Sequence, residues 1–170
     1  MKMTDLMPRN KWEELEGEIH DRFGLNARAY DARGFTFTGS TTWCNRLCPV
    51  IKSVPSALSA ICSVAHQTMA AEVSKTGRSV VSECDLGLVK ICVPVIARGE
   101  LVGVVGGCGR LPESGEIESF LAEKAAGLDP ETLQDLAGDL TVITAEEATE
   151  VVRFLENRVA QIVQDAFPRA

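Results

Sequence analysis

Residues 88–106 read LVKICVPVIARGELVGVVG, and this stretch decides the fold of the chain. Leu88–Ala97 and Glu100–Gly106 are both rich in valine and isoleucine, and the dipeptide Arg98-Gly99 separates them. Two apolar runs joined by a two-residue connection that contains glycine are typical of a β-hairpin. We therefore predict an antiparallel pair of strands here, as part of a central sheet.

Further elements lie on both sides of this hairpin. Period-two patterns and turn residues predict three more strands, at 26–31, 34–40 and 79–84. Apolar residues at helical spacing predict helices over 10–23, 56–76, 113–126, 130–136 and 144–167. This order predicts an α+β fold with a PAS/GAF-like central antiparallel sheet of about five strands, with helices on one face and a long C-terminal helix.

The C-terminal helix is predicted to begin at Thr144, which forms a capping box with Glu147. We expect a sensory domain over 1–143, including the helix over 10–23, and a separate C-terminal helix over 144–170. An apolar stripe runs along that helix, made of Val151, Leu155, Val159 and Ile162. Such a stripe must pack on the domain or on a second copy of the chain. We therefore expect a homodimer, with this helix as the dimerisation or output element.

Composition excludes several classes of protein. The net charge is −7, and no stretch holds more than two adjacent lysines or arginines, so the chain lacks the basic patch of a nucleic-acid binder. The apolar runs are too short to span a bilayer, and the first residues do not resemble a secretory signal. We expect a cytoplasmic protein without membrane or direct nucleic-acid partners.

Six cysteines in 170 residues are many for a chain in a reducing compartment. Cys44, Cys48, Cys62 and Cys84 surround the predicted junction of loop, helix and strand, where four thiolates could hold zinc or an iron–sulfur cluster. The alternative is that Cys62 and others are small core residues, as we expect for Cys92. His66 lies four residues after Cys62 and is either a further metal ligand or a partly exposed helix residue.

An enzyme with an activated cysteine is a second possibility. Cys44 and Cys48 lie in a predicted loop beside Arg46 and Lys52, which could favour a thiolate. No histidine, acid and oxyanion-hole pattern accompanies them, and the glycines over 103–109 do not form a phosphate-binding motif. We therefore expect no catalytic activity.

The stretch from Trp43 to Gly109 resembles the PocR sensory-domain family. The resemblance is carried by CPVIK (48–52), Cys62, KTGRSVV (75–81), CDLGL (84–88), VPVI (93–96) and the hairpin to Gly107. It implies a PAS-related sensor of small hydrocarbon derivatives such as short diols, working with transcription factors or histidine kinases. Cys48, Cys62 and Cys84 match cysteines of the family, and Asp85 stands where the family usually has histidine.

Together these observations predict a small-molecule or metal/redox-dependent sensory module of bacterial signal transduction or transcriptional control. We expect it to act in trans on a signalling protein or transcription factor. The ligand pocket should lie between the sheet and the helix over 56–76, with walls from Trp43, Cys48, Cys62, Met69, Cys84, Asp85 and Gly107. The remaining alternatives are a redox switch or enzyme using Cys44 or Cys48, and an acidic adaptor without a ligand.

Overall fold

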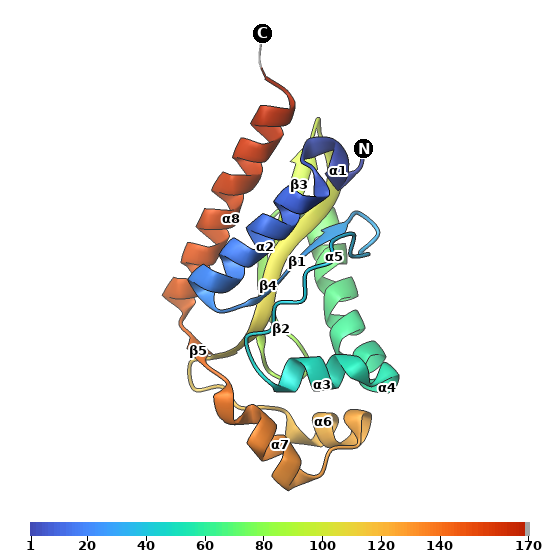
Figure 1. Ribbon diagram of the computed structural model, residues 1–170, viewed down its shortest axis with the longest axis vertical. Coiled ribbons are helices and arrows are strands. Elements are labelled where there is room, and N and C mark those ends of the chain that lie inside the picture. Colours follow the sequence, from blue (N-terminus) through green and yellow to red (C-terminus); the bar gives the residue numbers. More distant parts are fainter. Residues whose placement is uncertain (169–170) are drawn as a thin grey trace.

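Four antiparallel strands form the centre of the molecule in a computed structural model, which describes residues 1–168 (Figure 1). Their order across the sheet is β1-β4-β3-β2, and β5 pairs in parallel with the end of β4. The strands are β1 (Asn26–Asp31), β2 (Val80–Glu83), β3 (Val89–Ala97), β4 (Glu100–Pro112) and β5 (Val142–Ile143). The predicted α+β fold and the β3–β4 hairpin are confirmed, and β4 continues beyond its predicted end at Gly106.

Helices cover both faces of this sheet, rather than the single face that we expected (Figure 1). The first face lies under α1 (Met3–Leu6), α2 (Arg9–Phe23) and α8 (Ala145–Ala166). The second face lies under α3 (Leu47–Ser53), α4 (Pro55–Ala57), the π-helical turn η1 (Leu58–Ser63) and α5 (Val64–Thr76). Beyond the end of the second layer lie α6 (Ser119–Ala126), α7 (Pro130–Leu136) and the short 3-10 helix η2 (Ala137–Asp139).

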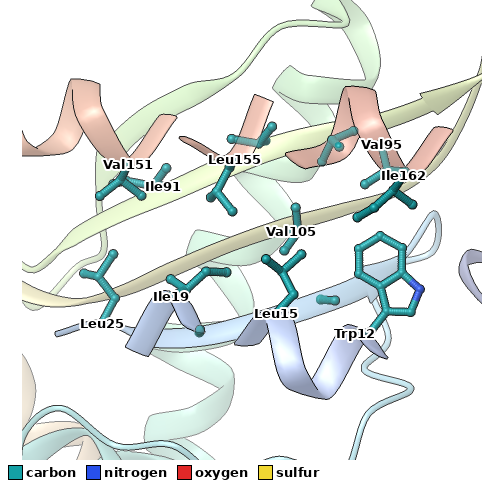
Figure 2. Packing of buried hydrophobic residues seen from close by; sticks show 14 of the residues in the cluster. Trp12, Leu15, Ile19, Leu25, Ile91, Val95, Val105, Val151, Leu155 and Ile162 are labelled. Carbon is teal, nitrogen blue, oxygen red and sulfur yellow. The ribbon is translucent and has the colours of Figure 1, made fainter. Parts of the chain in front are cut away.

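The first face holds the main hydrophobic core (Figure 2). Trp12 and Leu15 of α2 and Leu155 of α8 are completely buried there, together with Val95 and Val105 of the sheet. The apolar stripe that we predicted along the C-terminal helix is therefore packed inside its own chain. It no longer argues for a dimer, which stays a prediction.

The predicted strand over 34–40 is wrong. In this segment a single bridge joins Thr36 to Tyr30, and the chain then turns toward α2. There the Gly39 amide donates to the Glu13 carboxylate at 2.7 Å, and the Thr38 hydroxyl donates to the Glu16 carboxylate at 2.8 Å. The Gly39 amide, which a strand would donate to a neighbouring strand, is thus bound by a carboxylate of α2 instead.

Most predicted helices are confirmed, with shifted ends. The helix over 56–76 is interrupted by η1, the helix over 113–126 begins only at Ser119, and α3 occupies a region that we expected to be irregular. The capping box of α8 is present, with the Glu147 amide donating to Thr144 Oγ1 at 3.0 Å. Within residues 1–168 no single helix is both long and apolar enough to cross a membrane; α3 and the helix over 55–76 meet that test only as a pair bent by 101°.

Candidate functional site

The second face of the sheet carries polar side chains among its apolar ones, which the first face does not. Along β1, Ala27 and Ala29 are buried in the core under α2 and α8, whereas Asn26, Arg28 and Tyr30 lie on the opposite side. This follows from the strand itself, because successive side chains point to opposite faces. A six-residue strand with no long apolar side chain is therefore core on one side and a polar surface on the other.

The neighbouring strands extend this polar surface. Asn26 of β1 pairs in register with Cys108 of β4, and Cys108 pairs in turn with Lys90 of β3. Cys92 and Gly106 form the next pair along the same face. The side chains of three strands thus converge on one area, which α3, η1 and α5 cover.

A cavity of about 50 Å³ lies between this surface and its helical cover, and we call it the inner chamber. Its lining is Tyr30, Cys48, Ile51, Lys52, Ile61, Cys62, Ala65, Cys84, Leu86, Leu88, Lys90, Cys108 and Gly109. One ordered water needs roughly 10–15 Å³ of such volume, so the inner chamber has room for a molecule of only a few heavy atoms. Apolar walls with a few polar groups are typical of small-ligand sites.

Two further cavities adjoin the inner chamber and share Tyr30 and Lys52 with it. The outer cleft, about 340 Å³, is open to solvent and is lined by Tyr30, Arg33, Gly34, Phe35, Thr36, Lys52, Leu58, Cys62, Ser63, His66 and Gln67. The rear niche, about 10 Å³, is lined by Asn26, Arg28, Tyr30, Lys52, Lys90, Ile91, Cys92, Val104, Gly106, Gly107 and Cys108. The arrangement gives a small chamber with a wider entrance.

Lys90 places a buried cation at the floor of the inner chamber. Its residue is only 9% exposed, and its Nζ lies 5.9 Å from the centre of the Tyr30 ring. Burial lowers the pKa of Lys90, but the ionisable groups of Cys108, Tyr30, Cys92 and Cys62 together outweigh burial and raise the pKa overall. The direction of this shift favours the ammonium form of Lys90.

His66 is uncharged and has free hydrogen-bonding capacity. Its ring stacks on Tyr30 with 4.0 Å between the centroids. Burial, together with the charges of Lys90 and Lys52, lowers the pKa of His66 to about 4. Neither ring nitrogen has a hydrogen-bond partner in the described part of the chain, although both atoms are buried. A neutral imidazole offers one donor and one acceptor to whatever enters the outer cleft.

All six cysteines are free, and four of them gather around the inner chamber. Cys48, Cys62, Cys84 and Cys108 line the inner chamber. Asn45 holds two thiols beside it, with its Nδ2 donating to Cys48 Sγ at 3.3 Å and to Cys44 Sγ at 3.6 Å. Of the four cysteines that we expected to converge, Cys48, Cys62 and Cys84 line one chamber, and Cys44 lies beside it.

The chemistry that we expected of these thiols receives less support. Among residues 1–168 no three His, Cys, Asp or Glu side chains are arranged to hold a metal ion, so zinc or iron–sulfur binding by Cys44, Cys48, Cys62 and Cys84 stays a prediction. Burial raises the pKa of Cys44 and Cys48, so both are protonated at neutral pH. An activated nucleophile requires the opposite shift, and Cys48 lies in α3 rather than in a loop.

The predicted ligand-binding residues divide into two groups. Cys48, Cys62 and Cys84 line the inner chamber, and Gly107 lines the rear niche. The other three do not line these cavities. Lys52 Nζ lies 5.3 Å from the centre of the Trp43 ring, Met69 projects from α5 into an apolar cluster with residues of the sheet, and Asp85 is exposed in the turn after β2.

The sequence interpretation missed the polar floor of the site. Tyr30, Lys90 and Asn26 were not among the predicted residues, although their signals are visible. NARAYD over 26–31 alternates small and polar residues, and Lys90 is a lone charge inside an apolar strand. A charge at such a position is rarely buried without a functional or structural partner.

A polar sheet face under a helical cover, with a small chamber between them, is the arrangement of a PAS-like sensory domain. The family model described as the sensory domain found in PocR matches residues 5–167, and the chain belongs to this family. The match extends far beyond the stretch from Trp43 to Gly109 and includes α8. No curated protein and no solved structure matches the chain.

Proposed function

We propose that this sensory domain detects a small molecule that enters by the outer cleft and occupies the inner chamber. The observation that carries the proposal is the apolar inner chamber together with its two adjoining cavities, where buried polar atoms lack partners within residues 1–168: the ring nitrogens of His66 in the outer cleft and Asn26 Nδ2 in the rear niche. Buried polar groups are normally hydrogen-bonded, and an unpaired one costs stability. A ligand that satisfies His66 and its neighbours would remove that cost.

The helical cover is suited to report the ligand. Ile61 and Cys62 line the chamber from η1, a π-helical turn inserted between α4 and α5. Such turns are uncommon and are often found at functional sites. Contacts of the ligand with η1 and α3 would change the position of the cover, and a signalling protein or transcription factor acting in trans would recognise that change.

A thermal-denaturation screen of small metabolites tests this function. A ligand present at a hundredfold excess over its Kd should stabilise the fold by about 2.7 kcal/mol. Ala65→Leu should abolish the stabilisation, because Ala65 is buried in the chamber wall and the larger side chain fills the cavity. Ala71→Leu, at an exposed position of the same helix, is the matched control and should respond like the wild type.

Two results would count against the proposal. A broad screen without any stabilising compound would favour the acidic adaptor, which needs no ligand. Equal stabilisation of the wild type and a folded Ala65→Leu variant would place the binding site elsewhere.

Metal- or redox-dependent sensing is the second candidate, favoured by the gathering of Cys48, Cys62 and Cys84 around one chamber. The zinc and iron content of protein purified without oxygen decides between the two. Stoichiometric metal that is lost in a Cys62→Ser variant would support the metal sensor. Metal-free protein that still unfolds cooperatively would leave the organic ligand.

A further inference from the structure

The charge at the site is opposite to that of the whole chain. The protein has 24 acidic and 17 basic residues and a net charge of −7. Yet Arg28, Lys52 and Lys90 line the inner chamber or the rear niche, and no aspartate or glutamate lines either one. Three cations without an acid in so small a space, on so acidic a protein, indicate selection for a negatively charged occupant.

None of these three cations has a carboxylate within 4.0 Å in the described residues. The ion pairs found within residues 1–168 involve other side chains, and Arg28 makes a hydrogen bond only to the neighbouring Ala27 carbonyl, at 3.2 Å. Removing a charge from water without pairing it is costly. For Lys90, which is almost completely buried, an anion in the chamber supplies the missing partner.

Asn26 adds a neutral donor to the same place. Its residue is 4% exposed and lines the rear niche. The Cys44 amide donates to Asn26 Oδ1 at 2.7 Å, which fixes the orientation of the side-chain amide. Asn26 Nδ2 is then left buried and without a partner in the described part of the chain. Asn26 and Lys90 thus both present donors, as an anion with several acceptor oxygens requires.

We propose that the ligand is a small organic anion, a short-chain carboxylate held by Lys90, Lys52 and Asn26. This inference rests on the proposed function. The carboxylate lies toward the rear niche, and the hydrocarbon part packs against Ile51, Ile61 and Leu88 of the inner chamber. The small volume of the chamber limits the chain to a few carbons.

Binding of propionate, compared with two neutral molecules of similar size, tests the inference. Calorimetric titration of the full chain should show binding of propionate and at least about tenfold weaker binding of propionamide and 1,2-propanediol, because neither neutral molecule pairs with Lys90. Propionate affinity should also fall as salt is added, since the attraction is partly ionic.

Lysine variants locate the anion. Lys90→Met removes the charge but keeps a long, unbranched side chain, and it should weaken propionate binding at least about tenfold, without lowering the melting temperature of the free protein. Lys52→Met, at a partly exposed position, is a second variant that does not disturb the core and should also weaken binding. Lys75→Met, exposed on α5, is the matched control and should bind like the wild type.

Three results would overturn the inference. Propionamide or 1,2-propanediol binding as well as propionate, and unchanged in Lys90→Met, would show a neutral ligand while leaving the proposed chamber in place. Binding of inorganic phosphate but not of propionate would replace the carboxylate with another anion. Failure of all these probes, together with stabilisation by an unrelated compound that Ala65→Leu abolishes, would reject the carboxylate and retain the sensor.

Discussion

The two faces of the central sheet are built by the same strands but differ in almost every physical property. The face under α2 and α8 is closed. Trp12, Leu15 and Leu155 pack there, and each of these residues is at most 1% exposed (Figure 2). The face under α3, η1 and α5 carries cations, unpaired donors, all of the site's thiols and three cavities. One face stabilises the domain, and the other is left incomplete in a way that a ligand can complete.

The strand alternation explains how both properties fit in one sheet. In β1, Ala27 and Ala29 allow α2 to approach closely, while Arg28 and Tyr30 contribute to the cavities on the other side. Because the period of a strand is two, a polar site can be built without removing any residue from the core. Substitutions on the two faces should therefore have separable effects on stability and binding.

The largest effect is expected on the closed face. Leu155→Ala removes a completely buried side chain from α8 and should lower the free energy of unfolding by about 2–5 kcal/mol, measured by urea denaturation. Asn157→Ala, exposed on the same helix, should change it by less than about 0.5 kcal/mol. A loss below 1 kcal/mol for Leu155→Ala, which is far under that range, would mean that α8 does not belong to the core.

A smaller effect, dependent on pH, is expected on the open face. The pKa of His66 is lowered to about 4, whereas an unfolded histidine titrates near 6.5. Between these values the unfolded state binds more protons, so stability is complete above about pH 6.5 and decreases as the pH falls toward 4. Because His66 is partly exposed, we expect a loss of about 1–2 kcal/mol after allowing for solvent screening.

Urea denaturation of the wild type and His66→Gln between pH 7.5 and pH 4 measures this contribution. The difference between the two proteins should shrink or reverse toward acid, while His20 and the carboxylates contribute equally to both. Parallel pH profiles would show that His66 is charged in the fold or fully solvated.

The smallest effect concerns the thiols of the open face. Burial raises the pKa of Cys48, Cys62 and Cys84, so alkylation by iodoacetamide at pH 7 should be slower than that of a free thiol. Saturating propionate should slow it further, because the ligand occupies the chamber that these residues line. Mass spectrometry of the modified peptides gives the rate at each site. One thiol reacting much faster than the others would revive the nucleophile or redox switch.

The sequence was informative where local chemistry determines structure. The Arg98-Gly99 turn, the Thr144 cap and the apolar face of the helix over 56–76 are local patterns, and the structure contains all three elements. The strand predicted over 34–40 failed because its partners, the carboxylates of Glu13 and Glu16, lie more than twenty residues away in the sequence. Alternation alone does not reveal such a competitor.

Only part of the site could be predicted, because some of its residues are recognisable by type and others only by their place in the assembled sheet. Cys48, Cys62 and Cys84 stood out by residue type, and they do meet at one chamber. Lys90 and Asn26 did not stand out in the sequence. Their importance depends on which face of the sheet α5 covers and on the register that places both residues beside Cys108. That register is a property of the assembled sheet and cannot be read from any single strand.

Methyl NMR during a propionate titration distinguishes the two faces of the sheet in one experiment, because isoleucine δ1 methyl groups report on both faces at once. Ile51 and Ile61 line the inner chamber, whereas Ile19, Ile143 and Ile162 are buried in the core under α2 and α8. We expect saturable shifts of the Ile51 and Ile61 signals and unchanged signals for the three core residues. Shifts confined to Ile19, Ile143 and Ile162, or no shift at either face, would contradict this expectation.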